Sequence, residues 1–236
     1  MEIKNNISQV RSRSELQAEQ TRFLIKVYNW MGGGLLLTGI IAYITANVPA
    51  IGGVIFSNQI VFFGLIIAEL VLVVKLAGSV MKMSLAAASA SFLVYAILNG
   101  LTLSFIFLVY TQSSIAGAFI VTAGTFGTMS LYGAVTKRDL TAWGSFFMMG
   151  LIGVIIASVV NIFLNSPAIY WATTYLGVLI FVGLTAYDTQ KILRMNIIGN
   201  EGTAEDTKEA IRGALTLYLD FINLFLFMTR IMGNEK

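Results

Sequence analysis

The stretch Ala214–Leu226, ALTLYLDFINLFL, decides the fold, because it is an apolar run with a single carboxylate, Asp220, near its middle. A helix over Ile211–Ile231 would be about 31 Å long at about 1.5 Å per residue, which is enough to cross a bilayer. An acidic side chain at that depth is costly and needs a partner or a function. Steps of three and four residues place other small, polar or aromatic side chains on the same face: Gly213, Thr216, Asn223 and Phe227. We therefore expect the other helices to pack around this one.

The composition indicates an integral membrane protein. Of the 236 residues, 57% are hydrophobic and 11% are charged, and the mean hydropathy is +0.81, whereas soluble domains carry roughly a quarter charged residues. The chain has no cysteine, which excludes disulfides and thiol chemistry. It has no histidine either, so a response near neutral pH would require a perturbed carboxylate.

Charged residues divide the chain into spans. Three stretches contain none, and each is long enough for about two spans of ~20 residues with a polar or turn-forming patch between them: Val27–Ala68, Met83–Thr136 and Leu140–Tyr187. We predict an all-α polytopic membrane protein with seven transmembrane helices, the seventh central. The expected spans are 27–46, 59–79, 84–109, 115–135, 143–164, 168–188 and 211–231. Residues 1–26 would be a cytoplasmic tail, residues 27–232 the membrane domain, and Thr189–Ala210 a solvated loop.

Lysines and arginines predict the orientation. The N-terminal tail and the three connections on its side of the membrane hold all 15 basic residues except Arg230 and Lys236. Because cytoplasmic loops are enriched in basic residues, we expect a cytoplasmic N-terminus. Seven crossings would place the C-terminus outside, whereas Arg230 and Lys236 weakly favour a last helix that re-enters, and the sequence leaves both open.

Two aspartates are the main site candidates. Asp188 ends the sixth expected helix and Asp220 lies in the seventh, which runs antiparallel to it, so the carboxylates can meet toward the cytoplasmic half. For Asp188 alone, an ion pair with Lys191 is the structural alternative. For Asp220 a functional role is favoured, since an ionisable residue inside the membrane is a site hypothesis by default. Further cavity-lining candidates are Thr185, Thr216, Asn223 and Glu69.

Several other residues have more ordinary interpretations. Glu69 lies in the middle of the second expected helix, where it either lines the same cavity or forms a hydrogen bond with a neighbouring helix. Asp139, in a short basic loop, is predicted to be a surface charge. Glycines such as Gly124 and Gly127 are expected to let helices approach closely, and no strand or phosphate-binding residue accompanies them as a nucleotide loop would require.

Four segments resemble the Bax inhibitor-1 (transmembrane Bax-inhibitor-motif) family and its bacterial inner-membrane branch. They are GLTLS at Gly100–Ser104, SLYGAVTKRDL at Ser130–Leu140, VGLTAYDTQ at Val182–Gln190 and GALTLYLDFINLF at Gly213–Phe225, the last being the most specific. The resemblance implies a seven-helix fold, a pH-sensing aspartate pair and a calcium-leak activity. By motif, the pair falls on Asp188 and Asp220. Some relatives have an arginine late in the second helix that pairs with the aspartates, whereas this chain has only Lys75 and Lys82 there.

The leading hypothesis is a pH-sensitive calcium (cation) leak channel of the bacterial inner membrane. Two carboxylates in a low-dielectric pocket share a proton, and its loss leaves an oxygen cage that suits a hard cation such as calcium. The alternative is a non-conducting regulator of a membrane-anchored AAA protease, with which bacterial members of the family are associated. The expected partners are the lipid bilayer, calcium and protons, without nucleic acid and without a resident cofactor.

An enzyme is not expected. Intramembrane aspartyl proteases place glycine, one residue and glycine before their second aspartate, whereas Leu217, Tyr218 and Leu219 precede Asp220. A retinal-binding protein is disfavoured too, because the seventh expected helix has no lysine for a Schiff base.

Overall fold

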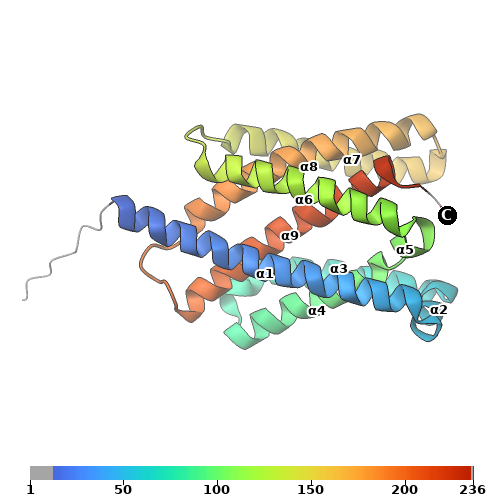
Figure 1. Cartoon of the computed structure of the whole chain (residues 1–236), viewed down its shortest axis with the longest axis horizontal. Coiled ribbons are helices and arrows are strands. Elements are labelled where there is room, and N and C mark those ends of the chain that lie inside the picture. Colours follow the sequence, from blue (N-terminus) through green and yellow to red (C-terminus); the bar gives the residue numbers. More distant parts are fainter. Residues whose placement is uncertain (1–12, 235) are drawn as a thin grey trace, which may run out of the picture.

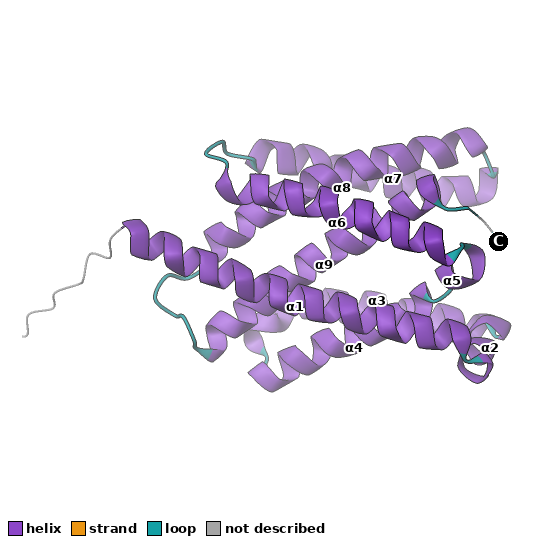
Figure 2. Cartoon of the chain, viewed as in Figure 1, coloured by secondary structure: helices purple, strands orange, loops and turns teal. Residues whose placement is uncertain are grey.

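Long helices joined by short connections make up the computed structural model, which describes residues 13–234 and Lys236 (Figures 1 and 2). The described residues form no strand. The helices are α1 (Arg13–Asn47), α2 (Pro49–Ser57), α3 (Gln59–Ser79), the 3₁₀ turn η1 (Val80–Lys82), α4 (Leu85–Leu103), α5 (Ile106–Val109), α6 (Gln112–Val135), α7 (Thr141–Leu164), α8 (Pro167–Met195) and α9 (Ala204–Met232). Within the described part of the chain, seven spans, one of which combines α4 and α5, are long and apolar enough to cross a membrane. The predicted class, an all-α polytopic membrane protein, is confirmed.

The prediction of a long loop over Thr189–Ala210 is wrong. α8 continues to Met195 and α9 begins at Ala204, so the connection is only 196–203. Thr203 caps α9, since its side-chain oxygen accepts a hydrogen bond from the backbone N–H of Asp206 at 3.1 Å. Both helices therefore extend beyond their apolar spans into polar sequence, where hydropathy gives no signal.

Three other boundaries differ from the prediction. α1 begins at Arg13, well before Val27, although residues 1–12 lie outside the described residues and the division into tail and membrane domain stays a prediction. The connection between the first two expected spans contains the short helix α2, which begins at Pro49, where a proline is tolerated because its missing N–H would have no partner within the helix. The expected helix 84–109 is broken into α4 and α5, with Ser104 between them.

α9 is the central helix. The buried share of its most apolar stretch is 61%, whereas the corresponding share is 6% in α3 and 6% in α7. Its packing partners are α1, α4, α6 and α8. At its middle, Tyr218 is completely buried, and the rings of Phe92 and Tyr95 pack against it edge-on. The Tyr218 hydroxyl shares a 2.7 Å hydrogen bond with Thr38 of α1. The predicted central position is therefore confirmed.

α9 runs the full length of the bundle, so that the start of α1 and the C-terminus lie at opposite ends (Figure 1). At its beginning, Lys26 Nζ of α1 lies 2.8 Å from Asp206 Oδ2. Beyond its end, the backbone N–H of Thr111 donates to the Asn234 carbonyl at 3.1 Å. The structure thus favours a complete crossing over a re-entrant last helix.

The side of the membrane on which each end lies is a prediction that single cysteines can test without background. Cysteines introduced at Asn58, between α2 and α3, and at Gln112 and Ala168, in the first turns of α6 and α8, all lie at the end of the bundle where the chain ends and should react with an impermeant thiol reagent in intact cells. A cysteine at Ile198, in the connection between α8 and α9, should react only after permeabilisation. The reverse labelling pattern would invert the proposed orientation.

Candidate functional site

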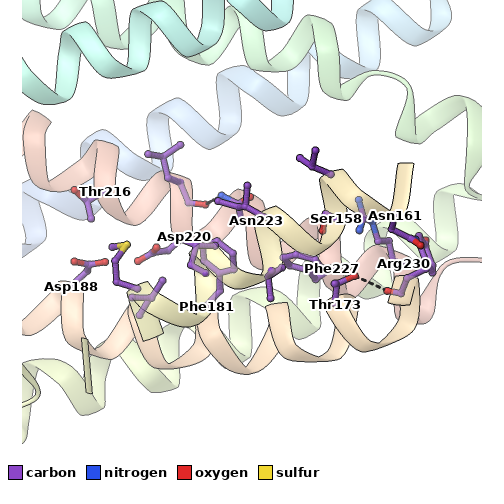
Figure 3. Close-up of a pocket in the computed structure, with 18 of the residues that line it drawn as sticks. Ser158, Asn161, Thr173, Phe181, Asp188, Thr216, Asp220, Asn223, Phe227 and Arg230 are labelled. Atoms are coloured by element: carbon purple, nitrogen blue, oxygen red, sulfur yellow. Dashed lines mark hydrogen bonds between the residues drawn. The ribbon is translucent and has the colours of Figure 1, made fainter. Parts of the chain in front are cut away.

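A cavity of about 720 Å³ lies between α7, α8 and α9. The two aspartates that the sequence singled out both line it, Asp188 from α8 and Asp220 from α9 (Figure 3). Figure 3 shows these acids toward one end of the cavity, and Asn161, Thr173 and Arg230 toward the other. The site therefore has an acidic end and a basic end, both formed around α8 and α9.

Both carboxyl groups of the pair are buried in the protein. Asp188 is 6% exposed and Asp220 is 5% exposed, and they are close enough for their charges to interact. The Oδ2 atom of Asp220 has no hydrogen-bond partner among the described residues. A buried carboxylate oxygen without a partner is strongly unfavourable, unless it carries a proton or contacts a cation. The arrangement is chemically suited to hold either.

Lys191 is the basic residue whose charge acts on both aspartates. No ion pair joins it to either of them in the described part of the chain, and its Nζ lies 5.6 Å from the centroid of the Tyr187 ring. The structure therefore shows no direct ion pair between Asp188 and Lys191, although the charge of Lys191 acts on Asp188.

Hydroxyl groups connect three helices beside Asp188. The Tyr28 hydroxyl of α1 lies 2.5 Å from Ser130 Oγ of α6, which lies 2.7 Å from Thr189 Oγ1 of α8. Nearby, α6 and α8 approach so closely that a Cβ added to Gly133 would lie 2.9 Å from the Cα of Ala186. These contacts fix the position of the part of α8 that carries Asp188 relative to α1 and α6. Sequence reasoning missed them, although Ser130 and Gly133 are three residues apart and so share a helix face.

The other predicted site residues divide into two groups. Thr216 and Asn223 line the cavity together with the aspartates. Thr185 does not line it, contrary to the prediction, and neither does Glu69, for which the alternative of a hydrogen bond with a neighbouring helix holds instead. Glu69 lies on α3, which packs mainly on α4, and it accepts a 2.7 Å hydrogen bond from Thr102 Oγ1. Thr185 donates its hydroxyl to the Phe181 carbonyl of its own helix at 2.7 Å.

The basic residues expected near the second span do not reach the cavity, since Lys75 and Lys82 are both outside its lining. At the end of the bundle where α1 begins, Asp139 is an exposed surface charge, as predicted, and lies 3.0 Å from Arg194 Nη1. Hydrogen bonds from Thr141, together with Arg194, lower the pKa of Asp139 from its usual value to about 2. This acid therefore belongs to a surface contact and not to the cavity.

Comparison with known proteins adds independent information. Residues 20–236 match the family described as inhibitor of apoptosis-promoting Bax1. The chain is 50% identical over 228 residues to the inner membrane protein YbhL of Escherichia coli K12, covering 96% of both chains. It is also 47% identical over 218 residues to the uncharacterised protein RP147 of Rickettsia prowazekii, covering 91% of this chain and 90% of that one. An uncharacterised protein of Borreliella burgdorferi is 45% identical over 217 residues, covering 92% and 94%.

Proposed function

The chain belongs to the family of the inhibitor of apoptosis-promoting Bax1, and we propose that it is a cation leak of the bacterial inner membrane controlled by Asp188 and Asp220. The observation that carries this proposal is a pair of buried carboxyl groups in one cavity, one of which has an unpaired oxygen. A membrane location is supported by the seven apolar spans among the described residues, and the inner membrane in particular by the similarity to the inner membrane protein YbhL. The family is not known as an enzyme family, and no catalytic step is part of the proposal.

Proton and cation would compete for the same oxygens. Two carboxyl groups in one low-dielectric cavity cannot both ionise cheaply, so the pair holds a shared proton. Loss of that proton leaves hard oxygen ligands of the kind that calcium prefers. Raising the pH should therefore increase cation occupancy, and lowering it should displace the cation.

The composition of the site favours weak cation binding. Calcium takes about six to eight oxygen ligands, and no group of three or more acidic, histidine or cysteine residues exists among the described residues. Thr216 and Asn223 are the uncharged polar residues that line the cavity near the aspartates (Figure 3). Water would have to complete the coordination shell, which suits a permeant ion better than a resident one.

A non-conducting regulator of a membrane-anchored AAA protease is the second candidate. The observation that favours it is the ordered polar surface at the end of the bundle where α1 begins. There Arg22 of α1 lies 2.6 Å from Glu201 Oε1 and Lys26 lies 2.8 Å from Asp206 Oδ2, both in or beside the connection between α8 and α9. These contacts form a fixed surface outside the apolar spans that a partner protein could bind.

Reconstitution separates the two candidates. The purified protein is placed in liposomes that contain a calcium indicator, and influx is measured from about pH 5 to 8, where the carboxylate pair would exchange its shared proton. The leak proposal requires an influx above that of protein-free liposomes, with a dependence on pH. A correctly folded protein that conducts calcium at no pH would contradict the leak and leave the regulator as the better candidate.

Glu69→Gln should leave the pH midpoint of this flux unchanged. The amide oxygen can still accept the hydrogen bond from Thr102, which is 2.7 Å long in the structure. Glu69 is also absent from the cavity lining, so its charge is not part of the proposed pair. The measurement is the same liposome assay across the same pH range. Complete loss of the pH response in this variant would show that Glu69, and not the aspartate pair, is the sensor.

A further inference from the structure

The end of the cavity opposite the aspartates carries a positioned cation. Arg230, in the last turn of α9, lines this end. Its guanidinium carbon lies 5.5 Å from the centroid of the Tyr170 ring and 5.4 Å from that of the Phe227 ring. No carboxylate forms an ion pair with Arg230 among the described residues. Stacking on aromatic rings restricts the guanidinium while leaving its N–H donors available to an anion.

An apolar groove leads from this cation toward the acids. Its walls include Val154, Ile155, Ile162, Phe181, Leu184 and Leu219. Asp220 and Arg230 are ten residues apart on α9, a separation of about 15 Å along the helix axis. One wall is α7, of whose most apolar stretch only 6% is buried. Since α7 packs mainly on α8, the groove borders the hydrocarbon of the bilayer.

Aromatic side chains place the cationic end at the level of the lipid headgroups. Tyr170 packs edge-on against Trp171, which stacks on Tyr175 with ring centroids 5.8 Å apart. Tyrosine and tryptophan gather at membrane–water interfaces. The groove therefore has an interfacial cation at one end and an apolar interior below it, which is the polarity of a lipid molecule.

We propose that this groove binds one anionic phospholipid from the surrounding bilayer. The phosphate contacts Arg230, and one acyl chain lies along the apolar walls toward Asp220. The planar guanidinium matches the oxygens of a phosphate group, and the negative headgroup supplies the charge that the described protein residues do not. The groove belongs to the cavity that contains the aspartates, but lipid binding can be measured whether or not the protein conducts cations.

The test measures bound lipid directly. The protein is purified in mild detergent, equilibrated with equal amounts of phosphatidylglycerol and phosphatidylcholine, and analysed by native mass spectrometry. The wild type should retain one lipid with a preference for phosphatidylglycerol. Arg230→Gln should reduce that preference about tenfold, the factor that corresponds to about 1.4 kcal/mol. The matched control is Lys236→Gln, which removes a cation from the same end of the bundle but outside the groove and should keep the preference.

A second variant tests the acyl-chain part of the proposal. Ser158 lines the groove between its two ends (Figure 3). Ser158→Phe should lower the retention of both lipids about equally, because it fills the groove without changing charge. A wild-type preference in Arg230→Gln, an equal loss of preference in Lys236→Gln, or undiminished retention in Ser158→Phe would overturn the assignment. So would a lipid-free wild-type dimer, since the groove would then be covered by a second copy of the chain.

Discussion

Asp188→Asn and Asp220→Asn should each flatten the pH dependence of calcium flux between about pH 5 and 8 and weaken calcium binding on the order of tenfold. Each substitution keeps the volume of the side chain but removes one charge and the shared proton. The remaining acid then titrates without a like charge beside it. Flux into liposomes and calcium titration of the purified protein measure the two effects separately.

The double variant provides the sharper test. Because the pair acts as one unit, Asp188→Asn/Asp220→Asn should add little to either single change, and the four proteins form a thermodynamic cycle. Asp139→Asn is the matched control, since it is the same chemical change at an exposed aspartate paired with Arg194. Wild-type pH midpoints in both single variants would show that these aspartates are not the sensor.

Gly133→Ala should destabilise the protein by about 1–3 kcal/mol, the usual range for overpacking. The new methyl group would meet the backbone of Ala186, with its carbonyl carbon at 2.8 Å. Backbone atoms cannot rotate away as a side chain can, so α6 must shift from α8. The same shift would stretch the Ser130–Thr189 hydrogen bond, which is 2.7 Å long. Thermal unfolding in detergent measures the loss.

Gly127→Ala is the control on the same helix. A Cβ added there meets nothing within 4 Å, so the substitution should be neutral or stabilise the helix by up to about 1 kcal/mol. Equal destabilisation by both changes would mean that backbone propensity, and not the contact between α6 and α8, determines the effect.

Much of the fold could be predicted because long stretches without charge leave few alternatives. The extent of α8 and α9 could not be predicted from hydropathy, since both continue into polar sequence outside the spans. A local signal was nevertheless present. Thr203 is followed three residues later by Asp206, the spacing of a side-chain cap at a helix N-terminus.

The site could be predicted only where helices that are consecutive in the sequence also pack against each other. Asp188 and Asp220 lie on consecutive antiparallel helices, and both line one cavity. Whether Glu69 lines the cavity could not be predicted, because a sequence does not show which helices surround α3. The same limitation affects the glycines. In the sequence, Gly124 and Gly127 indicate a close helix–helix contact as strongly as Gly133 does. In the structure, however, a Cβ added to Gly124 or Gly127 would meet nothing within 4 Å.

The central position of α9 has a consequence for biosynthesis. Its packing partners α1, α4, α6 and α8 all precede it in the chain, so a ribosome completes each of them before α9 reaches the membrane. Until then Thr38 of α1 lacks its hydrogen bond to Tyr218, and the helices inserted earlier have only one another and lipid to pack against. The final packing can therefore form only after α9, the last helix to be made, has entered among helices that were inserted before it.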